Sequence, residues 1–261
     1  MKKQNQISYY LRILITVVAY IIFFGYIIYS IINATTTESR IFNILIGIFV
    51  GGFGLIFDVG RIIYDAATKQ LIFDVNPDKA LSLLDTVNKI DIFKRYVTSS
   101  QMMRMLAMLD LRDYENLKTY INDLEKDEIT NYDVMITAKY AQMMAYGETG
   151  NKGKSNEAFK QLVNLRDEKV KGKRHKGAFF FNWEVVNGQH KNYDQDYESA
   201  LRYLSDVNES NMNKREVMHY LLAKLVAAKN TNNTDIYNTC KNRLFKILIN
   251  NKEMNEYVNS I

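Results

Sequence analysis

The chain has 261 residues, and its 34 Lys and Arg against 29 Asp and Glu give a mild net charge of +5. A single cysteine, Cys240, excludes an internal disulfide framework and a zinc site built from cysteines. One proline and few glycines after residue 60 argue against an all-β fold and predict helices. The abundant Lys, Asn, Ile and Tyr are typical of a low-GC bacterial genome.

Two long apolar segments lie in the first sixty residues. The first, residues 9–32, reaches the roughly 20 residues that a helix needs to cross a bilayer, and its one charge, Arg12, lies near an end. A cleavable signal peptide is the alternative, because Lys2 and Lys3 resemble its basic start. The apolar stretch is too long for that class, and no small-residue cleavage site follows it cleanly. We therefore expect a membrane-spanning helix.

The second apolar segment, residues 41–57, has no charge before Asp58. Glycines recur along it at helical spacing, and small residues let two helix backbones approach closely in a membrane. We expect them to pack on the first span, or alternatively on a second copy of the chain in a homo-oligomer. The predicted packing residues are Gly47, Gly51 and Gly54.

Basic residues flank the two spans unequally. The short turn between the spans carries Arg40, whereas the other flanks carry Lys2, Lys3, Arg12, Arg61 and Lys69. Cytoplasmic flanks carry the excess of Lys and Arg. The sequence therefore predicts a hairpin anchor, residues 1–60, in the cell membrane, with both termini and the whole of residues 61–261 in the cytoplasm.

Residues 61–261 show apolar residues at helical spacing throughout. The second span continues or re-forms beyond the membrane, and Asn76-Pro77 then ends it and starts a helix over residues 78–88. After this the pattern predicts pairs of helices: 93–111 with 114–126, 133–146 with 155–165, 176–190 with 195–207, and 214–229 with 234–249.

The second helices of these pairs begin alike. Their anchor residues Ala80, Leu117, Ala158 and Ala200 recur at intervals of about 37 to 42 residues, a period typical of stacked helical hairpins.

These helix starts resemble the second helix of the tetratricopeptide repeat family, in the segments Tyr114-Glu115, Asn156-Glu157-Ala158 and Tyr197-Glu198-Ser199-Ala200. The resemblance covers about residues 67–250 and implies an all-α fold, an α-solenoid of about four to five helix pairs. The period is longer than the family's 34 residues, and the family's Gly-Tyr pair and repeat-ending proline are mostly missing. A compact helical bundle is the alternative.

No constellation of residues indicates catalysis. The segment 147–155 misses the spacing of a phosphate-binding loop by one residue and has no strand before it, so we interpret it as a turn whose glycines supply positive φ. The histidines His175, His190 and His219 lack the i, i+4 partner of a helical metal site. We predict no enzyme activity, no cofactor and no metal site.

A basic run at residues 169–176 is the first of two candidate binding segments. A solvated loop is its simplest interpretation, and contact with anionic headgroups or an acidic partner is the alternative. Nucleic acid is not favoured, because no wider basic surface or binding motif accompanies the run. The residues concerned are Lys169, Lys171, Lys173, Arg174 and Lys176.

The second segment places four aromatic residues within residues 179–183. A helix cannot bury all of them on one side, so they fill the core in part and, in the alternative interpretation, line a groove for a partner. The candidates for partner contact are Phe180, Asn182 and Trp183.

These patterns favour a membrane-anchored cytoplasmic scaffold or adaptor that binds a protein or peptide in the groove of a helical-repeat domain. The alternative is a bacterial immunity protein that protects its host from a toxin or bacteriocin, a role that suits a small protein with a few spans and a helical domain. No particular residue supports that second hypothesis.

Overall fold

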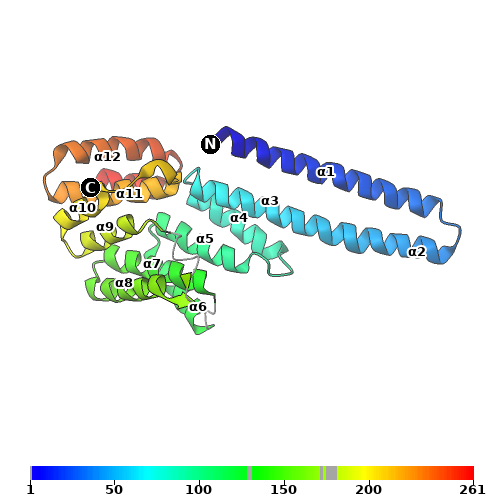
Figure 1. Cartoon of the computed structure of the whole chain (residues 1–261), viewed down its shortest axis with the longest axis horizontal. Helices are drawn as coiled ribbons and strands as arrows, with labels where there is room; N and C mark the ends of the chain where they lie inside the picture. The colour runs from blue at the N-terminus through cyan, green and yellow to red at the C-terminus, as the bar shows by residue number, and fades with distance from the viewer. Residues whose placement is uncertain (1, 128–130, 171–172, 175–180) are drawn as a thin grey trace. The chain divides into compact units, whose positions relative to one another are not determined.

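The structure, a computed structural model, describes residues 2–127, 131–170, 173–174 and 181–261, which are helical almost throughout. This confirms the all-α prediction at the level of fold class. The strands β1 (Lys169–Val170) and β2 (Lys173–Arg174) are two residues each and pair antiparallel. The chain divides into two compact units, residues 1–62 and 63–261 (Figure 1).

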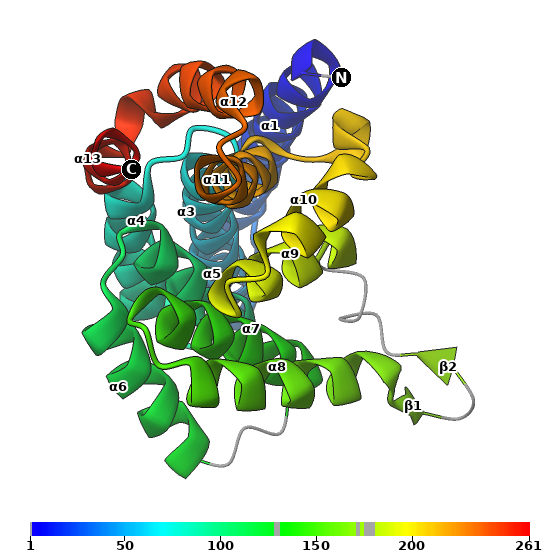
Figure 2. The same cartoon turned by 90° about the vertical axis from the view of Figure 1, so that its left-hand side faces the viewer.

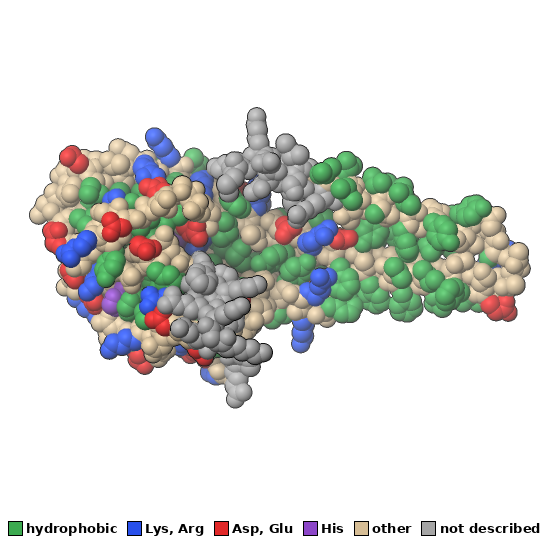
Figure 3. Space-filling model, viewed as in Figure 1, with side chains coloured by type: hydrophobic (Ala, Val, Ile, Leu, Met, Phe, Trp, Pro, Cys, Tyr) green, Lys and Arg blue, Asp and Glu red, His purple; other side chains and the backbone are tan. Residues whose placement is uncertain are grey.

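The N-terminal unit consists of α1 (Lys2–Ile32), α2 (Thr37–Ile46), the π-helix η1 (Gly47–Gly52) and the first part of α3 (Phe53–Ile72). Two helical runs, Leu14–Ile32 and Thr37–Ile72, are long and apolar enough to cross a membrane. Their large apolar side chains are mostly exposed, so these runs form no core of their own (Figure 3).

The glycines of the second run face α1. A Cβ on Gly51 would lie 2.6 Å from the ring of Phe24, and one on Gly54 would lie 2.7 Å from the hydroxyl oxygen of Tyr20. Gly47 faces Ile27, where a Cβ would lie 3.1 Å from that side chain. The absence of these Cβ atoms is what lets the two backbones approach each other.

The C-terminal unit begins with the last turns of α3 and continues as a series of helices joined by short turns. They are α4 (Pro77–Ile90), α5 (Val97–Asp110), α6 (Tyr114–Lys126), α7 (Tyr132–Glu148), α8 (Lys152–Asp167), α9 (Trp183–Tyr193), α10 (Tyr197–Ser205), α11 (Lys214–Asn230), α12 (Thr234–Ile247) and α13 (Lys252–Ser260).

The odd-numbered helices of this unit pack on one another in chain order, α5 on α7, α7 on α9 and α9 on α11. The even-numbered helices bridge them, because α6 contacts both α5 and α7, α8 contacts α7 and α9, and α10 contacts α9 and α11. Figure 2 shows α11 inside the arc that the other helices form. The interior of the unit is therefore lined by the odd-numbered helices.

The same kind of turn joins α3 to α4, α5 to α6, α7 to α8, α9 to α10 and α11 to α12. It contains one residue with positive φ, followed at once by an Asp or Asn at the N-cap of the next helix. Four of the five caps accept the amide of the residue three positions on, which satisfies a free N–H of the first helical turn. The positive-φ residues are Val75, Arg112, Gly150, Gln195 and Asn232, which lie 37, 38, 45 and 37 residues apart.

Two helix starts and one whole helix differ most from the sequence prediction. α5 begins at Val97 rather than at residue 93, because the Asp91 carboxylate accepts the amides of Arg95 and Tyr96 and holds residues 91–96 in a turn. α9 begins at Trp183, where the Asn182 side chain caps it. α13 was not predicted at all.

The interpretation of residues 147–153 as a glycine-dependent turn was wrong in part. Gly150 has positive φ, as the turn requires, but Gly147 lies within α7 and Gly153 within α8. A Cβ on Gly147 would overlap the ring of Tyr193. The absent side chain at residue 147 therefore serves the packing of α7 on α9.

Candidate functional site

A buried charge cluster joins α5 to α11. Asp110, the last residue of α5, has no exposed surface, and Arg215 and His219 lie one helical turn apart on α11. The Arg215 guanidinium donates from Nε and Nη2 to the two carboxylate oxygens of Asp110, at 2.8 Å each. Such a bidentate, charge-assisted pair has a fixed geometry.

His219 completes the cluster, with Nε2 2.8 Å from Oδ1 of Asp110. Burial alone would raise the pKa of Asp110, but Arg215 and the hydrogen bonds from its two partners lower that pKa below its usual value. The carboxylate is therefore ionised and can only accept, so Nε2 of His219 carries the proton. Burial and the neighbouring Arg215 lower the pKa of His219, which keeps its ring neutral near pH 7.

The cluster also fixes the backbone around it. Arg215 donates to the Leu106 carbonyl at 3.4 Å, and the Asn251 amide donates to the Asp110 carbonyl at 3.1 Å. Asn251 is fully buried and caps α13 through Met254. These bonds connect α5, α11 and α13, which are far apart in the chain.

His219 lines both of two cavities in this unit. One has a volume of about 230 Å³ and the other about 290 Å³. The smaller is lined from α5, α7, α9, α11 and α13, with the turn residue Arg112 and Tyr114 of α6. The larger is lined from the end of α3 and from α5, α7, α9 and α11. Both lie on the inner surface of the odd-numbered helices.

The smaller cavity is the more polar of the two. Arg112 pairs with Glu148 at 2.8 Å, and the Tyr193 hydroxyl donates to the same carboxylate at 3.2 Å. The Arg112 guanidinium carbon lies 3.4 Å from the centroid of the Tyr257 ring. Burial raises the pKa of Tyr257 to about 12, so its hydroxyl stays protonated. The charges of this cavity are thus already matched by partners within the chain.

The larger cavity is mainly apolar and rich in methionine. Met102, Met103 and Met212 line it together with Leu106 and the valines of α9. Methionine side chains are flexible and polarizable, and they adapt to apolar groups of different shape. This cavity is the better suited of the two to an apolar side chain from outside the domain.

The candidates for partner contact have separate places in the structure. Asn182 lines the larger cavity, while its side chain caps α9. Trp183 packs against a core cluster and lies under Arg166, whose guanidinium carbon is 4.8 Å from the ring. Phe180 lies outside the described residues. Phe181, which was not among the candidates, lines the larger cavity and stacks on Tyr140 at 4.3 Å.

The residues of the basic run are described only in part. Lys169 lies in β1, and Lys173 and Arg174 lie in β2, where Lys169 pairs with Arg174 across the ribbon. Lys171 and Lys176 lie outside the described residues. The candidate lipid site at this run therefore stays a prediction.

Sequence reasoning missed the cluster of Asp110, Arg215 and His219, because it considered only His219, and only as a metal ligand. The carboxylate is 105 residues from its arginine, so no local motif connects them. The available signals were an acid that ends the apolar helix α5 and an Arg-His pair at i, i+4 on α11. Within the described ranges, no group of three or more His, Cys, Asp or Glu is placed to hold a metal ion. Comparison with protein-family models, curated proteins and solved structures finds no match.

Proposed function

We propose that the chain is a membrane-anchored scaffold whose C-terminal unit is an α-solenoid of five helix pairs, α3/α4 to α11/α12. The observation that carries this proposal is the recurring turn, in which a positive-φ residue is followed by a capping Asp or Asn. Its spacing of 37 to 45 residues is that of stacked helical hairpins.

The packing order supports the same architecture. In a solenoid each hairpin contacts its neighbours along the chain, and the first helices line the inner surface. The contacts α5–α7–α9–α11, bridged by the even-numbered helices, follow this order. The contact between Asp110 and Arg215 departs from this order, because it joins the second helix pair directly to the fifth.

The inner surface is the proposed binding site. Solenoids bind extended peptides and helices on their concave side. Here that side holds the apolar, methionine-lined cavity of about 290 Å³. We propose that it accepts an apolar side chain of a protein or peptide partner, with Asn182, Thr137 and Glu216 supplying polar contacts at its wall.

The N-terminal unit supplies the anchor. We propose that residues 14–32 and the apolar part of Thr37–Ile72 cross the cell membrane as a hairpin, with both termini in the cytoplasm. The outward-facing apolar side chains of both runs support this arrangement. Fusion of alkaline phosphatase or a fluorescent protein after Ile261 tests the orientation, because the phosphatase is active only outside the cytoplasm. An active phosphatase fusion would reverse the proposed topology.

Binding is tested with full-length protein solubilised from membranes. Met102→Trp fills the larger cavity and is expected to abolish recovery of the partner in a pull-down read by mass spectrometry. Tyr203→Trp is the matched control, because Tyr203 is exposed on α10 and lines neither cavity. Equal recovery of the partner with both variants would rule out the cavity as the binding site, provided that circular dichroism shows both to be folded.

A further inference from the structure

The turn between α4 and α5 exposes apolar side chains. Ile92 is 64% exposed and Phe93 is 49% exposed, and Val97 at the start of α5 is also exposed. The turn is held in this form by Asp91, whose carboxylate accepts the amides of Arg95 and Tyr96. Adjacent apolar side chains held outward by a fixed backbone indicate an interaction surface.

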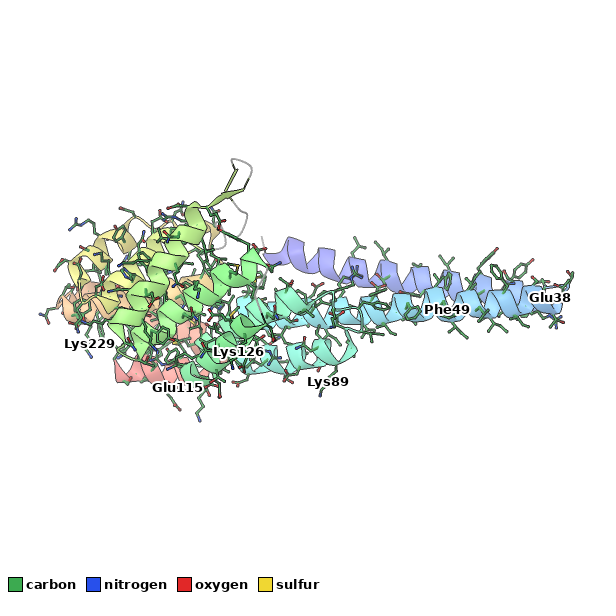
Figure 4. The ribbon with its side chains drawn as sticks, turned by 90° about the horizontal axis from the view of Figure 1, so that it is seen from below. Glu38, Phe49, Lys89, Glu115, Lys126 and Lys229 are labelled. Atoms are coloured by element: carbon green, nitrogen blue, oxygen red, sulfur yellow. The ribbon has the colours of Figure 1, made fainter. Side chains whose placement is uncertain are left out.

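The same turn is basic. Lys89, Lys94 and Arg95 are exposed around the apolar pair, and Figure 4 shows the Lys89 side chain pointing away from the ribbon. The acid in this stretch, Asp91, is directed at the backbone amides of the turn. Apolar side chains framed by cations match the interface of a bilayer, where acyl chains meet anionic headgroups.

A ring pair fixes the end of the turn within its own unit. Tyr96, directly after the turn, stacks on Tyr64 of α3 with ring centroids 5.0 Å apart. The backbone that presents Ile92 and Phe93 is therefore held at both ends, by Asp91 and by Tyr96.

We propose that the α4–α5 turn, residues 89–97, is a second membrane contact: Ile92 and Phe93 enter the headgroup layer of an anionic bilayer, and Lys89, Lys94 and Arg95 bind its phosphates. The partner is the lipid surface that the hairpin itself crosses, so the contact rests on the proposed anchor. The contact adds to the spans a point of attachment that restricts tilting of the helical domain.

Single cysteines test the contact in the full-length chain. Cys240, the natural cysteine, is 2% exposed, so labelling of the unaltered chain measures the background. Phe49→Cys, Ile92→Cys and Ile249→Cys each receive a bimane label and are reconstituted into phosphatidylcholine vesicles with and without phosphatidylglycerol. Brominated acyl chains then quench labels that reach the lipid. Phe49 reports on the anchor, and Ile249, which is 77% exposed, reports on the solvated surface of the domain.

The expected result is strong quenching at residue 49 in all vesicles, quenching at residue 92 that is greater with phosphatidylglycerol, and none at residue 249. Quenching at 49 with residue 92 behaving like residue 249 would overturn the turn contact and leave the anchor intact. No quenching at 49 would overturn the anchor and the contact together. Equal quenching at 92 in both kinds of vesicle would overturn the requirement for anionic lipid.

Charge reversal provides a second measurement. In the Ile92→Cys chain, Lys89→Glu with Lys94→Glu and Arg95→Glu is expected to reduce quenching to the level of the solvated control. The matched triple variant is Lys152→Glu with Lys160→Glu and Lys229→Glu, which changes three exposed lysines elsewhere on the domain and is expected to leave quenching at residue 92 unchanged. Equal loss in both triple variants would assign the effect to net charge and overturn the local contact.

Discussion

Replacement of Asp110 by Asn removes the charge that compensates Arg215 without changing the shape of the side chain. Both carboxylate oxygens bind Arg215, and one also binds His219, all at 2.8 Å. Loss of one partner of a buried ion pair costs about 3–5 kcal/mol, because the other charge is left buried without a partner. For a domain of this size, 1 kcal/mol corresponds to about 2–4 °C, so the thermal midpoint should fall by about 6–20 °C.

The assay is thermal unfolding of the full-length chain in detergent micelles, followed by circular dichroism and by the fluorescence of Trp183. The matched control is Glu209→Gln, because Glu209 also binds an arginine through both oxygens, but both partners are partly exposed. Exposed pairs contribute about 0–1 kcal/mol, so this variant should shift the midpoint by no more than about 4 °C. Equal shifts in the two variants would refute the argument from burial.

A double variant separates the lost pair from the unpaired charge. Asp110→Leu with Arg215→Met removes both charges and replaces them with apolar groups. Replacement of a complete buried pair is often neutral, whereas a single broken pair is strongly destabilising. The double variant should therefore unfold at a higher temperature than Asp110→Asn. A lower midpoint for the double variant would show that the pair stabilises the domain beyond mutual compensation.

Three further results are expected. A valine at Gly51 would overlap the ring of Phe24, so Gly51→Val should lower the aggregation temperature in micelles. Gly52→Val is the control, because no atom lies within 4 Å of its added Cβ, and it should leave that temperature unchanged. Equal effects of the two variants would contradict the packing of Gly51 on Phe24. Gln195 has φ of 66°, which costs a non-glycine residue about 1–2 kcal/mol, so Gln195→Gly should raise the thermal midpoint and Gln195→Val should lower it. Since the folded chain lowers the pKa of His219, the unfolded chain binds the proton first as the pH falls from about 7 to about 5. The midpoint should fall over that range, and by less in His219→Gln; an equal fall would exclude this titration.

Much of the helical framework follows from local sequence patterns. The helix Tyr114–Lys126 has the predicted bounds, because the Arg112-Asp113 break combines a chain reversal with a capping residue. Asn76-Pro77 likewise marks the start of α4, with Asn76 as cap and Pro77 as first residue. Such signals lie within a few residues of the boundary that they set, and a single sequence is enough to detect them.

The recurring turn could not be recognised from the sequence, for a physical reason. Its left-handed position favours glycine, but the structure has Val75, Arg112, Gln195 and Asn232 there and glycine only at residue 150. Each of the four accepts backbone strain that the packing of the helices compensates. A search for turn glycines therefore finds one of these turns, whereas the described backbone has five.

The candidate site depends on contacts that local patterns do not encode. Asp110 and Arg215 each have the appearance of an ordinary helix-end charge until the fold buries them together. Phe181 was one of several adjacent aromatics, and its place beside Tyr140 follows from how α9 packs on α7. Which aromatic faces a cavity is decided by helix rotation, and the sequence pattern leaves that rotation open.

The pairing of Asp110 with Arg215 also affects how the chain is synthesised. Repeat arrays of the solenoid type can fold from one end as they leave the ribosome, because each unit needs only its neighbour. Here the ion-pair partner of Asp110 in α5 is an arginine that is synthesised 105 residues later. Until Arg215 has been made, the early helices cannot pack around Asp110 without burying an unpaired carboxylate. The helical domain is therefore expected to complete its folding as one cooperative unit after release, and a chain truncated before α11 should be degraded rather than persist as a shorter folded domain.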